Sequence, residues 1–233
     1  MKVMKDLSGE LCKENIKIEY QDVFSKYANK LMNEYCLKVD DKKYNLIEIE
    51  FYFYDKENHP DPYIYCNEKQ KECGEFYFHG SGMDITFGNG ICYGGILIRS
   101  IMNQKGEYIN GSLILLEELF GDKIDKSKIE LIEKEDIEKK DIEKKDIEKK
   151  DIEKKDIFCS TRVGLQAHPL DYELLIKYEN NFIPYIFRLY RFIVDYSCSK
   201  NKCKDKTKIA FYEHLKNKNK PRPNYKQDSI KEN

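Results

Sequence analysis

The sequence lacks tryptophan, an excess of basic residues, and any apolar run long enough to cross a membrane. Its 233 residues include 41 Lys or Arg and 42 Asp or Glu, and its formal net charge is −1. The whole chain therefore lacks the basic footprint of an electrostatic nucleic-acid binder. No window approaches the roughly 18 consecutive apolar residues of a membrane-spanning helix, and the first residues lack the apolar segment of a signal peptide. We expect an intracellular protein, nuclear or cytoplasmic, with no membrane partner.

Alternating and helical patterns of apolar residues predict a mixed α+β fold. The segment YNLIEIEFYFY (44–54) alternates as a strand, and residues 75–102 contain two or three strands punctuated by glycine. Helices are expected over 20–38, 111–120 and 171–196, the last divided near Pro184, and HPDPY (59–63) is expected to be a loop. The predicted fold class is a single α+β domain whose curved, largely antiparallel sheet is flanked by helices.

A charged repeat and a basic tail divide the chain. Residues 132–157 repeat D-I-E-K-K with a period of five, so successive isoleucines step around a helix instead of forming a stripe. We interpret this segment as a low-complexity insertion without chemistry, with a coiled-coil partner site as the alternative. Residues 1–131 and 158–198 would then form one domain. Residues 199–233 form a basic tail, either solvated or contacting phosphates.

The strand over 44–54 presents two acids and a tyrosine on one face. Glu48, Glu50 and Tyr52 alternate with apolar residues that pack the other face. If the polar face lines a cleft, partial desolvation and repulsion between the two carboxylates raise the pKa of one of them, and that carboxylate can act as a general base. If the face lies in water, the acids are solvated and have no catalytic part.

Other constellations in the sequence fit known sites poorly. His59, Cys66, Cys73 and His79 are zinc-ligand types, but their spacing does not match paired zinc-finger units. Cys92 or Ser81 could pair with a histidine, yet no nucleophile elbow surrounds either residue. We therefore predict no metal and no cofactor.

Taken in order along the chain, several short motifs resemble the alkyladenine (3-methyladenine) DNA glycosylase family. They are E-I-E-F-Y (48–52), a histidine seven residues later, F-Y-F-H-G-S-G-M (76–83) and I-L-I-R-S (96–100). The segment STRVGLQ (160–166) stands where that family has a G-P-x-x-L segment. The resemblance covers residues 44–102 and, more loosely, 158–170.

The resemblance assigns roles to residues in these motifs. Glu50 would activate the hydrolytic water, Tyr52 and His59 would hold a flipped base, and Arg99 would orient the site or contact the nucleic-acid backbone. The turn at Gly82 and Met83 would form the floor of the base pocket. His79 and Asp84, on either side of that turn, would read the polar edge of the base. With Glu48 these residues make up the predicted site.

Two functions from different classes follow. The first is a monomeric, metal-independent DNA N-glycosylase of base excision repair, which removes an alkylated or deaminated base and contacts DNA partly through the tail. The second is a non-catalytic module on the same fold that binds nucleic acid or protein. A Glu50 that faces an aromatic-walled pocket favours the hydrolase, and one on an open, wet sheet face favours the module.

Overall fold

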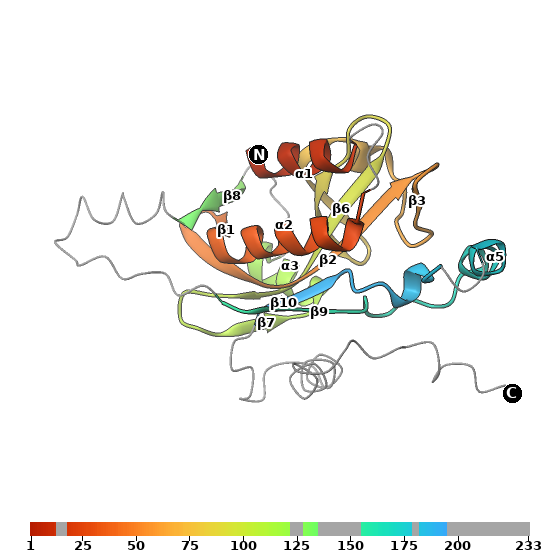
Figure 1. The fold of residues 1–233 in the computed structure, drawn as a ribbon. Helices are drawn as coiled ribbons and strands as arrows, with labels where there is room; N and C mark the ends of the chain where they lie inside the picture. Colours follow the sequence, from red (N-terminus) through yellow and green to blue (C-terminus); the bar gives the residue numbers. More distant parts are fainter. Residues whose placement is uncertain (13–17, 122–127, 135–154, 179–181, 195–233) are drawn as a thin grey trace, which may run out of the picture.

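The computed structural model describes residues 1–12, 18–121, 128–134, 155–178 and 182–194. These residues form an antiparallel sheet with helices packed around it (Figure 1). The helices are α1 (Lys2–Leu11), α2 (Tyr20–Glu34), α3 (Ser112–Phe120) and α5 (Pro169–Tyr178), with short 3-10 turns η1 (Glu68–Lys71) and η4 (Tyr185–Phe187). The strands are β1 (Tyr35–Val39), β2 (Lys42–Asp55), β3 (His59–Pro60), β4 (Cys73–His79), β5 (Gly82–Phe87), β6 (Tyr93–Met102), β7 (Tyr108–Asn110), β8 (Ile129–Glu133), β9 (Ile157–Ser160) and β10 (Arg191–Val194).

Strand β2 is the centre of the sheet. Along one edge it pairs with β6 over most of its length, and β5 and β4 continue the sheet from there. Its other edge is shared in turn by β1, β10 and β3. The register with β6 is irregular near Glu48, where the edge partner changes from β1 to β10, and such an irregularity bends a strand. The sheet consequently curves, as predicted, and the α+β class is confirmed.

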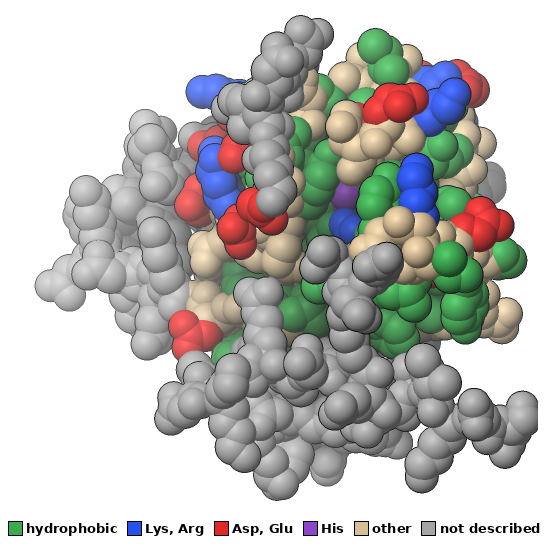
Figure 2. Space-filling model, turned by 45° about the vertical axis from the view of Figure 1, so that its right-hand side comes forward, with side chains coloured by type: hydrophobic (Ala, Val, Ile, Leu, Met, Phe, Trp, Pro, Cys, Tyr) green, Lys and Arg blue, Asp and Glu red, His purple; other side chains and the backbone are tan. Residues whose placement is uncertain are grey.

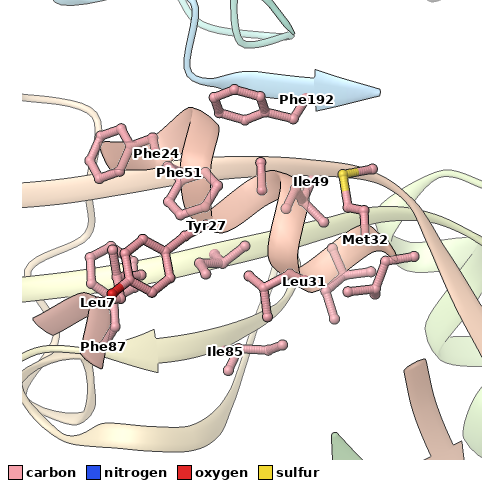
Figure 3. Close-up of a cluster of buried hydrophobic side chains, with 14 of the residues drawn as sticks. Leu7, Phe24, Tyr27, Leu31, Met32, Ile49, Phe51, Ile85, Phe87 and Phe192 are labelled. Atoms are coloured by element: carbon pink, nitrogen blue, oxygen red, sulfur yellow. The ribbon is translucent and has the colours of Figure 1, made fainter. Parts of the chain in front are cut away.

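The apolar face of β2 carries the main core. Helices α1 and α2 lie on this face (Figure 1). Phe51 is fully buried, stacks on Phe24 of α2 with ring centroids 4.7 Å apart, and meets Phe192 of β10 edge-on at 5.5 Å. Figure 3 shows these rings together with Ile85 and Phe87 of β5. Strand β2 thus carries the rings that hold α2 on the sheet, whereas α1 packs against β4, β5 and α2.

Two predicted helices end differently in the structure. Helix α2 stops at Glu34, and Tyr35 begins strand β1, which the turn at Asp40 joins to β2 as a hairpin. In the predicted helical segment 171–196, α5 ends at Tyr178 and residues 191–194 form β10 instead of a second helix. Both segments form hydrogen bonds with an edge of β2. This pairing between distant segments outweighs the helical periodicity of their sequences.

Three smaller predictions have different outcomes. Residues 75–102 do contain three strands, and the helix over 111–120 ends at Gly121 as expected. His59 and Pro60, predicted to lie in a loop, form a two-residue edge strand beside Tyr54 and Asp55. Proline is tolerated there because an edge strand leaves one N–H position unpaired.

The charged insertion and the tail lie mostly beyond the described residues. Of segment 132–157, the structure describes 132–134 and 155–157, and the basic tail at 199–233 falls outside it. Among the helices that are described, none is both long and apolar enough to span a membrane.

Replacing Phe51 should test how far the fold depends on the apolar face of β2. We expect Phe51→Ala to lower the free energy of unfolding by about 3–5 kcal/mol, because it removes a ring packed between α2 and β10. Urea unfolding followed by circular dichroism measures this change. Ile176→Ala, at an α5 side chain that is 80% exposed, should change stability by less than about 0.5 kcal/mol. Equal losses in the two variants would contradict this assignment of the core.

Candidate functional site

A cavity of about 700 Å³ lies over the polar face of the sheet. Its walls come from strands β2, β5 and β6, from the segment at 62–65, from the start of α3 and from the segment at 163–168. Its volume falls within the range of small-molecule sites. In Figure 2, a histidine and a basic side chain are visible in a hollow bordered by hydrophobic side chains. The cavity provides one enclosed place on this face where a ligand can be surrounded.

Tyrosine rings and a few polar groups line this cavity. The rings belong to Tyr52, Tyr63 and Tyr65, and Tyr65 is 58% exposed. The residues that line the cavity include one basic side chain, Arg99, and one acidic side chain, Asp84. Aromatic walls with a small number of placed polar groups are typical of sites that bind small molecules.

Glu50 lies directly behind the wall of the cavity. Its side chain is fully buried; Oε2 accepts the Tyr52 hydroxyl at 2.8 Å, and Oε1 accepts the Val163 N–H at 2.8 Å. The Arg99 Nε atom is 3.5 Å from Oε1. Each of these three partners lines the cavity, whereas Glu50 does not. A ligand can therefore reach Glu50 only where Tyr52, Arg99 or Val163 gives way.

Burial sets the acidity of Glu50. Loss of hydration raises the pKa of this carboxyl, and the neighbouring Arg99 charge and the Val163 N–H oppose that shift. Repulsion from Glu48 also raises the pKa, but it is a smaller cause than burial. The sequence-based argument named both partial desolvation and repulsion from the second carboxylate as causes of the raised pKa; in the structure, burial is the larger cause.

Glu48 is held by two arginines from different strands. Its Oε1 atom accepts Arg99 Nε at 3.0 Å and Arg191 Nε at 2.7 Å, and Oε2 accepts the Ser100 hydroxyl at 3.2 Å. Arg191 belongs to β10, the segment predicted to be helical. Glu48 therefore fixes Arg99 at the cavity and joins β10 to the centre of the sheet.

His79 and Asp84 meet across the turn between β4 and β5. The Nε2 atom of His79 is 3.0 Å from Asp84 Oδ1, and Gln70 donates its amide to Oδ2 at 2.9 Å. The Ser81 N–H donates to His79 Nδ1 at 3.2 Å, so Nε2 carries the proton that Asp84 accepts. Both side chains line the cavity, and they bind each other.

Five predicted site residues do not line the cavity: Glu48 and Glu50, described above, and His59, Met83 and Gly82. His59 is fully buried on the apolar side, where Nδ1 is 2.8 Å from the Phe53 carbonyl oxygen and Nε2 is 2.9 Å from the Tyr190 hydroxyl. Met83 alternates with Asp84 and points into the core. Gly82 has φ +141°, and an added Cβ would lie 2.7 Å from Ser112 Cβ, so its missing side chain allows α3 to approach the turn.

The cysteine and histidine set considered for zinc is not assembled. His59 is buried in the core, whereas Cys66 is exposed. In the part of the chain that the structure describes, no three His, Cys, Asp or Glu side chains are grouped closely enough to hold a metal ion.

A buried ion pair between Arg162 and Asp61 lies close to Tyr52 and Tyr63, and the sequence does not predict it. Arg162 donates to Asp61 Oδ2 through Nη1 at 2.6 Å and to Oδ1 through Nη2 at 3.2 Å, and both side chains are fully buried. Arg162 lies within STRVGLQ, and Asp61 lies between the two prolines of HPDPY. Nothing in the local pattern of either segment shows that they meet, because about a hundred residues separate them.

No model of a known protein family matches this chain. Over 135 residues the chain is 36% identical to a protein of Acanthamoeba polyphaga mimivirus described as uncharacterized protein L759. That alignment covers 46% of this chain and 62% of the viral protein. The chain thus spans less than two thirds of this relative.

The burial of His59 should make stability depend on pH. Burial lowers the pKa of His59 well below its ordinary value of 6.5. Below about pH 6.5, His59 is protonated in the unfolded chain but not in the folded chain. This difference lowers the free energy of unfolding by about 1.4 kcal/mol for each pH unit of further acidification. We expect His59→Gln to lose this part of the slope in urea unfolding measured from pH 7 to pH 5. His168→Gln, at an exposed histidine, should keep it, and a His59→Gln variant with the wild-type slope would refute the assignment.

Proposed function

We propose that the protein is an N-glycosidic hydrolase that removes a damaged base from DNA, with Glu50 as the general base. The observation that carries this proposal is the position of Glu50, which is buried directly behind an aromatic-walled cavity and bound to two cavity-lining side chains, Tyr52 and Arg99. The polar face of β2 is therefore covered, and it is not the open, wet surface that would favour a binding module.

The base would lie against tyrosine rings. Tyr52 and Tyr63 line the cavity from β2 and from the segment after β3, and stacking of a base on an aromatic ring contributes about 1–3 kcal/mol. His59, which the resemblance assigned to this task, packs on the other side of β2. In this proposal Tyr63 takes the place of His59.

The reaction needs a carboxylate next to the sugar. The C1′–N bond breaks with its electron pair leaving on the base, and positive charge develops on the sugar. A water oxygen then bonds to C1′ while Glu50 takes a proton from that water. A carboxylate can both stabilise the developing charge and accept the proton. Arg99 would orient the water, since its side chain lines the cavity and lies 3.5 Å from Glu50.

A second candidate is a module that binds a base or nucleotide without hydrolysis. The observation that favours it is that both oxygens of Glu50 already accept hydrogen bonds and that the side chain has no exposed surface. In the hydrolase, substrate binding must open a path for water between Tyr52 and Val163. Catalytic hydrogen bonds often reach their working geometry only in the substrate complex.

The wider biological assignments are parts of the same proposal. We propose, from the resemblance and from the composition of the chain, that DNA is the partner, that the basic tail contacts it, and that the protein is an intracellular monomer of base excision repair. The tail lies outside the described residues.

Replacing Glu50 tests the hydrolase directly. Glu50→Gln keeps the size of the side chain but removes the proton acceptor, so release of a susceptible base should fall about 100-fold or more. The assay follows base release from oligonucleotides that carry alkylated or deaminated bases, resolved by electrophoresis. Binding of the same oligonucleotides, measured by fluorescence anisotropy, should change by less than about threefold.

A matched control separates this effect from general damage. Glu57→Gln makes the same chemical change in the exposed turn after β2, and it should leave base release unchanged. Full release by the Glu50→Gln protein would exclude Glu50 as the base. Binding without release in the unaltered protein would favour the second candidate.

A further inference from the structure

We infer that Cys12 and Cys92 are a redox pair, which a peroxide converts into a disulfide between the end of helix α1 and the connection from β5 to β6. Both cysteines are free thiols in the structure, and their side chains are hydrogen-bonded to each other. Neither side chain lines the cavity. The pair is therefore a second site, independent of the proposed hydrolase.

Helix α1 directs the Cys12 sulfur toward the connection, which is formed by residues 88–92. Cys12 follows the last residue of the helix, and its N–H donates to the Ser8 carbonyl oxygen at 3.2 Å. Ser8, one helical turn earlier and on the same face, donates its hydroxyl to the Gly88 carbonyl oxygen at 3.1 Å. Asn89 donates its side-chain amide to the Cys12 sulfur at 2.9 Å. Two contacts one turn apart thus hold α1 against the connection.

The Asn89 side chain contacts both cysteines. Its Nδ2 atom donates to the Cys12 sulfur, and its Oδ1 atom accepts the Cys92 N–H at 2.7 Å. One amide group therefore positions the sulfur of Cys12 and the backbone of Cys92 relative to each other. The thiol–thiol hydrogen bond keeps the two sulfur atoms adjacent, and a disulfide would draw them together to about 2.0 Å.

The two thiols differ in acidity and exposure. Cys12 is partly exposed, and its hydrogen bond with Cys92 lowers the pKa of Cys12, against the opposing effects of burial and of Asp55. The same hydrogen bond raises the pKa of Cys92, which is buried. Because the thiolate is the nucleophile, Cys12 reacts first with a peroxide. A reactive thiol with a second thiol beside it is the usual arrangement of redox-sensing cysteines.

The reaction consumes one peroxide for each disulfide. The Cys12 thiolate attacks one oxygen of hydrogen peroxide, so that a sulfur–oxygen bond forms and the oxygen–oxygen bond breaks. The other oxygen leaves as hydroxide and takes up the proton that the Cys12 thiol released. The Cys92 sulfur then attacks the sulfenic acid sulfur of Cys12, and the hydroxyl group leaves with the Cys92 proton as a second water. The two thiols are oxidised to a disulfide, and the peroxide is reduced to water.

Other described cysteines are less suited to this reaction. Cys36 is buried, Cys66 is exposed and Cys73 lies between these extremes, and burial raises the pKa of each of these thiols. Cys66 provides the sharpest comparison. It is more exposed than Cys12, yet its raised pKa leaves less thiolate, so it should react with peroxide more slowly.

Thiol titration and disulfide mapping test the pair. The full chain has eight cysteines, and the reduced protein is treated with an equimolar amount of hydrogen peroxide at neutral pH. After denaturation, the number of titratable thiols should have fallen by two, and dithiothreitol should restore them. Proteolysis and mass spectrometry should identify a disulfide-linked pair of peptides that contain Cys12 and Cys92. Retention of all the thiols, or a disulfide mapped to any other pair, would overturn the inference.

Three serine variants assign the roles of the two thiols. Cys92→Ser removes the second thiol, so Cys12 should remain a sulfenic acid that dimedone labels. Cys12→Ser should form no disulfide at Cys92 under the same conditions. Cys66→Ser is the matched control at an exposed thiol, and it should still lose two thiols. Labelling of Cys66 ahead of Cys12 in the Cys92→Ser protein would also overturn the inference. If that variant does not fold, the disulfide map of the unaltered chain decides.

Discussion

The burial of two carboxylates in the middle of one strand is the constraint on which this structure depends. Glu48 and Glu50 lie on β2 with almost no exposed surface, and an unpaired buried carboxylate costs several kcal/mol. Each is held by groups from elsewhere in the chain: Arg99 from β6, Arg191 from β10, and the Val163 N–H from the segment after β9. The contacts that pair the two carboxylates also hold these distant segments near the polar face of β2. Arg99 and Val163 thereby become part of the wall of the cavity.

The two faces of β2 have different roles, one in the core and one at the cavity. The apolar face packs against α2 through rings such as Phe51, whereas the polar face carries Glu50 and Tyr52 toward the cavity. Because side chains alternate along a regular strand, a shift of one residue beyond the irregularity at Glu48 would exchange the two faces. The packing of the core therefore fixes the register that positions the site.

Prediction from the sequence succeeded where the pattern is local. The alternation over 44–54 correctly placed Glu48, Glu50 and Tyr52 on one face, and the three strands at 75–102 follow from glycine and aromatic residues. The prediction failed at Tyr35 and at Arg191. The helical spacing of apolar residues continues there, but the chain pairs with a free edge of β2 and forms a strand. His59 was assigned to the polar side, yet the short strand β3 turns it into the core against Phe53 and Tyr190.

The α+β class, the two faces of the central strand and the placing of His79 and Asp84 on either side of one turn can be predicted from local sequence, because they depend on neighbours within a few residues. The pairing of Arg162 with Asp61, the contact of Arg191 with Glu48 and the hydrogen bond from Val163 to Glu50 emerge only in the folded chain. These contacts join residues about 100 or more positions apart. No periodicity records such pairs, since they arise only when burial of the core brings the segments together.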